Sequence, residues 1–162
     1  MNEDNISSWY NLSEGTAVTK FYLNGSDDNS TLYLARAVGA NSAVGIFAAV
    51  RNDGNEILSQ NMHVGDRDRL TMAAGATMFK QSVKLATAYT LTGMQTRTSV
   101  DIETNTAETI TTEEEYPEEY FFGYTSGVGG NPDVNWLYGY LQSFTYYPTQ
   151  VSDDALQALT TQ

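Results

Sequence analysis

Short runs in which apolar and polar residues alternate recur about every 8–12 residues along this chain, separated by turn-forming residues. In the run 17–23, the odd-numbered residues from Ala17 to Leu23 share one face of an extended chain. The segment 52–55 (NDGN) is typical of a hairpin turn, because Asn and Gly tolerate positive φ. The other predicted strands are 31–36, 43–51, 56–62, 69–72, 77–83, 83–91, 98–103, 107–112, 120–124 and 137–147. This pattern predicts an all-β protein, an antiparallel sandwich or barrel.

The predicted strands differ in strength. The run 83–91 alternates most regularly and predicts a central strand, whereas 69–72 and 77–83 alternate weakly. Near the end of 137–147, Leu141 and Phe144 are both large and apolar but three residues apart. This spacing breaks strict alternation, so it indicates either a β-bulge or a strand buried on both faces.

One short helix is predicted at the C-terminus. Pro148 ends the last strand, because proline cannot donate to a ladder. Ser152 is a good N-cap, and the next two residues are aspartates in the first turn, where the helix dipole favours negative charge. Leu156 and Leu159 share one face, which we expect to pack against the sheet.

Composition limits the number of domains and the partners. The chain has 162 residues, with no linker and no repeat, which predicts a single domain over 1–162 with a flexible N-terminal arm at 1–7. Eight Lys and Arg against 20 Asp and Glu leave a net charge of −12, so binding to nucleic acid or to anionic membranes is disfavoured. The absence of cysteine excludes disulfides and thiol chemistry. Residues 1–16 are polar and acidic, unlike an export signal.

The C-terminal motif carries a family resemblance. Residues 139–148 (GYLQSFTYYP) and 151–160 (VSDDALQALT) resemble the ending of concanavalin A-like, laminin-G/pentraxin-like domains of bacteriophage virion and tail proteins. Segments 8–16, 84–89 and 120–130 are similar to the opening strand, the central strand and the glycine-rich penultimate loop of those domains. The resemblance implies a concanavalin A-like jelly-roll β-sandwich of two antiparallel sheets with a short C-terminal helix.

Catalysis is the alternative function for such a fold, because many of its members are glycoside hydrolases. Residues 99–103 (SVDIE) are comparable to the Glu-x-Asp-x-Glu strand of laminarinase-type enzymes, with Ser99, Asp101 and Glu103 on one face. The position of the nucleophilic glutamate is Ser99 here. His63, the one histidine, lies at a predicted strand end with no nucleophile elbow in the chain. We therefore assign no catalytic residue, with a tail-associated polysaccharide-degrading enzyme as the alternative.

Carboxylates offer weak candidates for a metal site. The oxygen-rich groups at 27–29, at Asp66 with Asp68, and at Asn131 with Asp133 suit Ca²⁺, but none forms an EF-hand pattern. We assign no metal ligand and no cofactor, and calcium stays an alternative. The acidic run 113–119 is interpreted as a solvated loop or strand edge, or as a surface for a basic partner.

Aromatic residues indicate a binding surface. The chain has 11 Tyr and two Trp, several of them in 116–124 and 136–147. An aromatic face can stack on a sugar while amides and carboxylates bind its hydroxyls, or the same aromatics can fill the core of the sandwich. The candidate residues for binding a glycan or a protein partner surround one glycine-rich loop: Tyr124, Asn131, Asp133, Asn135 and Trp136.

The resemblance implies a non-enzymatic, lectin-like structural protein on the virion surface, folded in the cytoplasm of the host. It implies either a tail-fibre module that binds host cell-surface polysaccharide or a capsid decoration or minor structural protein that binds other virion proteins. The chain begins at Met1 and carries no fibre stalk, which favours the second placement. Virion proteins are usually symmetric, so a homo-oligomer is also expected.

Overall fold

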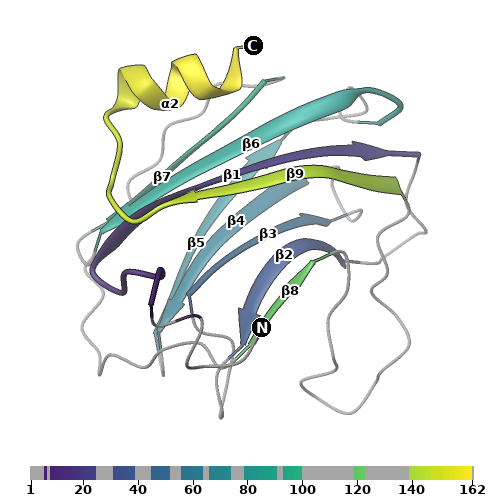
Figure 1. The fold of residues 1–162 in the computed structure, drawn as a ribbon. Coiled ribbons are helices and arrows are strands. Elements are labelled where there is room, and N and C mark those ends of the chain that lie inside the picture. Colours follow the sequence, from purple (N-terminus) through teal and green to yellow (C-terminus); the bar gives the residue numbers. More distant parts are fainter. Residues whose placement is uncertain are drawn as a thin grey trace.

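A computed structural model describes residues 6, 8–24, 31–38, 45–51, 56–63, 66–73, 79–90, 93–99, 119–122 and 139–161, and side chains are described within 6–24, 79–99 and 139–161 (Figure 1). These residues form nine strands and one C-terminal helix. The elements are β1 (Glu14–Leu23), β2 (Thr31–Val38), β3 (Gly45–Arg51), β4 (Glu56–His63), β5 (Asp66–Ala73), β6 (Ser82–Thr90), β7 (Gly93–Thr98), β8 (Glu119–Phe122), β9 (Gly139–Tyr147) and α2 (Asp153–Thr160).

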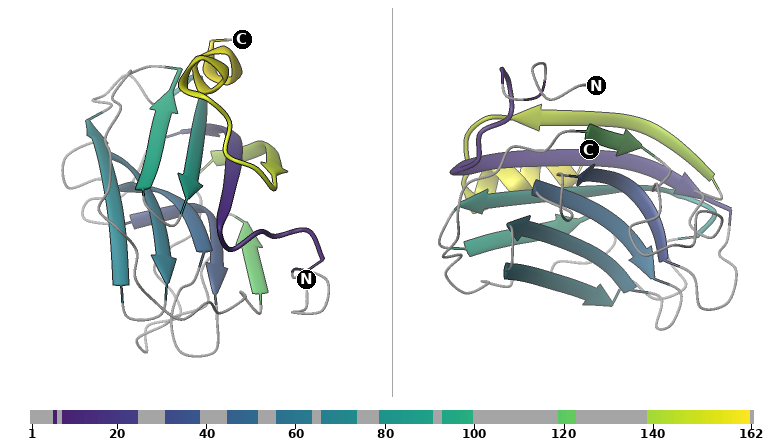
Figure 2. Two further views of the ribbon diagram at one scale, coloured as in Figure 1. Left: turned by 90° about the vertical axis from the view of Figure 1, so that its left-hand side faces the viewer. Right: turned by 90° about the horizontal axis from the view of Figure 1, so that it is seen from below.

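The strands form two antiparallel sheets stacked as two layers (Figures 1 and 2). One sheet has the order β7-β6-β1-β9 and the other the order β5-β4-β3-β2-β8. Every strand pair within them is antiparallel. Strands that are far apart in the sequence therefore become neighbours: β1 lies beside β9, and β2 lies beside β8. The all-β sandwich of two antiparallel sheets is confirmed.

The predicted central strand 83–91 corresponds to β6, which pairs with β1 on one side and β7 on the other. Val83, Leu85 and Tyr89 are buried on the face toward the second sheet. Ala86 and Ala88 are buried on the opposite face, beneath Leu156 of α2. Burial on both faces explains the prevalence of apolar residues along this strand.

One predicted strand is wrong in the part that the structure describes, and a second is described only at its first two residues. For 77–83, Phe79 makes only an isolated bridge to Leu23, and Lys80 follows in a turn with φ of 58°, so the strand starts at Ser82. For 98–103, Thr98 is the last residue of β7 and Ser99 follows the strand, so the rest of this strand stays a prediction. Residues 100–118, including the predicted strand 107–112, lie outside the described residues.

A β-bulge in β9 explains the spacing of Leu141 and Phe144. Lys20 of β1 pairs with Ser143, whereas Phe21 pairs with Leu141, so Gln142 is the extra residue. The bulge restores Leu141 and Phe144 to the same side of the strand, the side of Phe21. The sequence left two alternatives open at this point, and the structure selects the bulge.

The C-terminal helix packs on the outside of the four-stranded sheet (Figure 2). The Ser152 hydroxyl accepts from the Ala155 N–H at 3.3 Å, which confirms the expected N-cap. Leu156 is fully buried against β6, and Leu159 is partly buried. No helix among the described residues has the length and apolarity needed to cross a bilayer.

The start of the chain is tied to the core at one point. Ile6, which falls within the arm expected at 1–7, is fully buried in the same hydrophobic cluster as Tyr10 and Leu12. The prediction of a flexible arm is therefore wrong at Ile6, because its apolar side chain is removed from water. Residues 1–5 and 7 lie outside the described residues.

Candidate functional site

The five residues predicted to bind a glycan or partner cannot be located relative to one another. Tyr124, Asn131, Asp133, Asn135 and Trp136 all lie outside the described residues, so this site stays a prediction. Several of the described aromatic residues instead form two separate groups, one structural and one at the surface.

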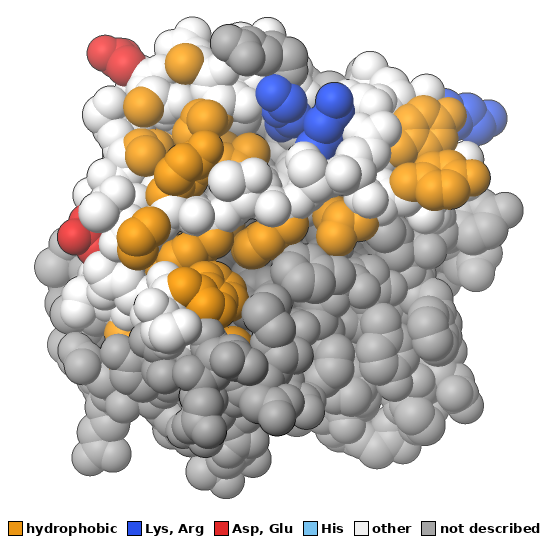
Figure 3. Space-filling model, in the orientation of Figure 1, with side chains coloured by type: hydrophobic (Ala, Val, Ile, Leu, Met, Phe, Trp, Pro, Cys, Tyr) orange, Lys and Arg blue, Asp and Glu red, His pale blue; other side chains and the backbone are white. Residues whose placement is uncertain are grey.

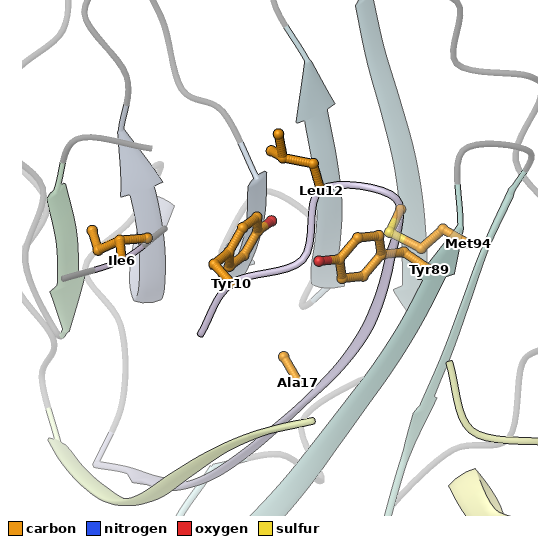
Figure 4. Packing of buried hydrophobic residues seen from close by; sticks show 6 residues of the cluster. All are labelled: Ile6, Tyr10, Leu12, Ala17, Tyr89 and Met94. Atoms are coloured by element: carbon orange, nitrogen blue, oxygen red, sulfur yellow. The ribbon is translucent and has the colours of Figure 1, made fainter. Parts of the chain in front are cut away.

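The structural group lies between the two sheets at one end of the sandwich (Figure 4). The Tyr10 ring stacks on Tyr89 and on Tyr146, with ring centroids 6.3 and 5.3 Å away, and Trp9 meets Tyr146 edge to face at 5.1 Å. For these residues the interpretation of the aromatics as core is the correct one. Part of the tyrosine excess serves packing.

Hydrogen bonds connect this group into a closed ring around Asn11. The Asn11 N–H donates to the Tyr146 hydroxyl at 2.9 Å, and the Tyr89 hydroxyl donates to the Asn11 carbonyl. Because the Tyr89 proton is used there, the 2.9 Å bond between the two hydroxyls takes its proton from Tyr146. Burial raises the pKa of both hydroxyls above the ordinary tyrosine value, far above it for Tyr89. This ring holds the segment before β1 against β6 and β9.

The surface group lies on the outer face of the four-stranded sheet, where the sheet register places six side chains in two rows across three strands. In one row, Tyr22 of β1 lies between Ser82 of β6 and Tyr140 of β9. Tyr140 is 65 % exposed, and its ring centroid lies 6.3 Å from that of Tyr22 with the planes tilted by 45°. The pair is an aromatic platform open to solvent.

The second row is basic. Lys20 of β1 lies directly opposite Lys84 of β6 and, on its other side, opposite Ser143 of β9. Both lysines are partly exposed, and the Lys84 ammonium reaches the Leu159 carbonyl in the last turn of α2 at 3.4 Å. We call the two rows together the outer-face patch: Lys20, Tyr22, Ser82, Lys84, Tyr140 and Ser143.

In Figure 3, the basic and the acidic side chains in view lie in different places on the surface. Lys and Arg side chains lie beside hydrophobic ones on the described upper part of the molecule, and the acidic side chains in view lie at its left edge. Arg97 of β7 forms an ion pair with Asp153 of α2, with nitrogen–oxygen distances of 2.9 and 2.6 Å. The lysine pair therefore provides a local positive region on a chain whose net charge is −12.

The residues considered for catalysis and metal binding are not brought together in the described part. Ser99 is used structurally, since its hydroxyl accepts from the Lys84 N–H at 3.0 Å and its own N–H donates to the Lys84 carbonyl at 2.9 Å. Asp101, Glu103 and Asn131 lie outside the described residues. His63 ends β4 opposite Asp66, as expected for a strand end. Within the described ranges, no group of three metal-ligating side chains forms.

Sequence reasoning placed Lys20 and Tyr22 on the same face of the strand 17–23, but it did not identify the patch. The partners of these residues come from β6 and β9, about 60 and 120 residues further on. No local signal indicates that pairing, so only the register of the sheet could have found it.

No protein-family model and no curated protein matches this chain. Solved structures do. The receptor-binding domain of botulinum neurotoxin mosaic serotype C/D superposes with a TM-score of 0.68 at 14 % identity, over 98 % of this chain and 38 % of that chain. The CBM40 of Ruminococcus gnavus IT-sialidase, bound to α2,6 sialyllactose, gives 0.62 at 15 %, over 93 % of this chain and 84 % of that one.

The NanB sialidase of Streptococcus pneumoniae gives a TM-score of 0.69 at 13 % identity, over 98 % of this chain and 26 % of that chain. At these identities the likeness concerns the fold. The chain thus has a two-sheet β-sandwich fold similar to that of these domains, which agrees with the jelly-roll prediction. It spans 38 % of the toxin chain and nearly the length of the CBM40.

Proposed function

We propose that this chain is a non-enzymatic, lectin-like domain that binds carbohydrate and is displayed on the surface of a bacteriophage particle. It serves there as a capsid decoration or minor structural protein, or as a tail-fibre component. Its partners are other virion proteins and the polysaccharide of the host cell surface, and it folds in the host cytoplasm before assembly.

The extent of the fold likeness is the observation that carries the carbohydrate-binding part. The CBM40 that matches 93 % of this chain was solved with a sialylated sugar, and 84 % of that chain is covered. The NanB sialidase is matched over 26 % of its chain, so the likeness concerns one part of that protein. The open aromatic platform of Tyr22 and Tyr140 provides a surface of the kind that stacks on sugar rings.

The virion placement is supported by the C-terminal motif. Residues 139–148 and 151–160 resemble the ending of phage lectin-like domains, and they form β9 and α2. β9 extends the sheet of β1, and α2 covers the outside of β6. The motif is therefore part of the architecture of the domain.

A glycan array tests the carbohydrate-binding part. We expect the purified chain to retain a subset of glycans, with dissociation constants in the micromolar to millimolar range for a single site. Binding must survive competition by the free oligosaccharide. If no glycan on an array that includes host surface polysaccharide is bound, the proposal of a lectin is wrong.

Two further measurements test where the chain lies on the particle and whether it is an enzyme that degrades polysaccharide. Labelled antibody against the chain, viewed by electron microscopy on intact particles, is expected to decorate the capsid or the tail. Incubation with host capsule is expected to release no reducing ends. Release of reducing ends at a catalytic rate would show that the chain is the polysaccharide-degrading enzyme and not a binding module. Particles that carry no antibody label would contradict the placement on the virion.

A further inference from the structure

We propose that the outer-face patch binds the acidic sugar unit of a glycan, with the lysine pair receiving its carboxylate and the tyrosine pair stacking on its ring. This inference rests on the proposed function and adds the place on the fold and the chemical class of the ligand.

The lysine pair is the first argument. Like charges directly opposite each other on adjacent strands repel and destabilise a sheet, yet Lys20 and Lys84 occupy such a pair. Between them an anion would be attracted by both ammonium groups. A carboxylate has two oxygens, so it can accept one charge-assisted hydrogen bond from each lysine. A neutral sugar cannot relieve the repulsion in this way.

The two lysines differ in their other contacts. Lys84 holds the Leu159 carbonyl at 3.4 Å, which anchors its ammonium at the C-terminal end of α2. Among the described residues, Lys20 has neither an ion pair nor a side-chain hydrogen bond. We therefore assign the main contact with the carboxylate to Lys20 and a supporting, electrostatic role to Lys84.

The size of the patch suits one sugar ring. Neighbouring strands lie about 4.8 Å apart, so the three strands span about 10 Å, and the two rows are separated by about 7 Å along the strands. The exposed Tyr140 ring and its neighbour Tyr22 offer the stacking surface in one row. Ser82 and Ser143, both exposed, place a hydroxyl at each side for the ring hydroxyls. The lysines stand in the adjacent row, at the distance of a ring substituent.

The test compares matched acidic and neutral sugars. The full chain is titrated by calorimetry with a glucuronate-terminated oligosaccharide and its glucose-terminated counterpart, and with 3′-sialyllactose and lactose. We expect the acidic member of at least one pair to bind about tenfold more tightly, the effect of one charge-assisted hydrogen bond.

Three variants locate the site. Lys20→Gln is expected to remove the preference for the acidic sugar, whereas Lys20→Arg, which keeps the charge, retains it. Tyr140→Ala is expected to weaken the acidic and the neutral sugar alike, by about two- to tenfold. Ser13 directly precedes β1, at the end of the strand away from Tyr22; Ser13→Asp changes the net charge by the same amount as Lys20→Gln and is expected to leave binding unchanged. A cooperative thermal unfolding transition in each variant shows that it is folded.

The outcomes separate this inference from the proposed function. If neutral and acidic sugars bind equally well, or if Lys20→Gln and Tyr140→Ala leave binding unchanged, the chain is a lectin but the outer-face patch is not its acidic-sugar site. If Ser13→Asp and Lys20→Gln weaken binding of the acidic sugar equally, the effect comes from net charge alone. That result would also overturn the inference. If no sugar binds the unaltered chain, the proposed function itself is wrong.

Discussion

At the scale of single residues, Asn11 shows how one polar residue joins distant parts of the fold. Beyond its backbone bonds to Tyr89 and Tyr146, its side-chain amide donates to the Pro148 carbonyl at 2.9 Å, and its side-chain oxygen accepts from the Ser13 N–H at 3.0 Å. Gly15 leaves the space for this arrangement, because a Cβ there would lie 2.6 Å from the Tyr146 hydroxyl. The hydroxyl ring is thus a packing unit in which the backbone N–H and carbonyl of Asn11 and both tyrosine hydroxyls are hydrogen-bonded.

Removing one hydroxyl from this ring tests its contribution to stability. Tyr89→Phe leaves the Asn11 carbonyl without its main donor, so we expect the free energy of unfolding to fall by about 1–3 kcal/mol. Denaturant unfolding followed by circular dichroism measures the change. Tyr140→Phe removes a hydroxyl from a 65 % exposed ring and is the matched control, with an effect within about 0.5 kcal/mol. An equal effect of both substitutions would contradict the role of the ring.

The same hydroxyls make stability depend on alkaline pH. Burial raises the folded-state pKa of Tyr89 and Tyr146 above the unfolded value of about 10, so the folded protein keeps protons that the unfolded chain releases. Stability from these groups is therefore complete below about pH 10 and is lost as the pH rises above it. We expect unfolding midpoints to fall between about pH 10 and pH 12, and less steeply in Tyr89→Phe.

At the scale of elements, the ion pair between β7 and α2 shows why one strand escaped prediction. The segment 93–98 (GMQTRT) has little apolar character, and the sequence predicted a strand only from Thr98 onward. Four of its six residues are buried, because β6 pairs with one side of the strand and Asp153 of α2 neutralises Arg97, which is 8 % exposed. The local pattern of apolar and polar residues cannot indicate a contact between β7 and a helix about 55 residues further along the chain.

Asp153→Ala tests how firmly this ion pair attaches the helix. The substitution leaves the nearly buried Arg97 guanidinium without its carboxylate, so we expect a loss of about 1–2 kcal/mol, moderated because the Asp153 side chain is 47 % exposed. Chemical denaturation of both proteins provides the measurement. Asp154→Ala changes the net charge equally in the same helical turn and is expected to cost less. The reverse order would mean that the aspartates act through the helix dipole alone.

At the scale of the whole molecule, the net charge of −12 opposes folding through repulsion among carboxylates. Raising NaCl from about 10 mM to about 150 mM shortens the screening length from about 30 Å to about 8 Å. We expect the melting temperature, measured by calorimetry, to rise over this range. Sulfate at equal ionic strength checks for an effect of the ion itself. A fall in melting temperature would mean that attractive pairs such as Arg97–Asp153 outweigh the repulsion.

Local sequence patterns were enough to predict several elements of this fold. Alternation predicted β1 and β6, the two apolar residues three apart in β9 indicated a bulge as one alternative, and Ser152 with its two aspartates predicted the helix that begins there. These features depend on period, capping and turn chemistry, which act between residues close in the chain.

Which strands are neighbours, and therefore which side chains meet, depends on packing across the whole fold. Pairing of β1 with both β6 and β9 brings Lys20 opposite Lys84 and Tyr22 opposite Tyr140, and it joins Tyr89 and Tyr146 around Asn11. Strand register across gaps of many residues is set by the fit of the whole core, since a shift by one residue would exchange the two faces. For that reason the sequence predicted the two-sheet sandwich, whereas the strand register brought together the residues of the outer-face patch.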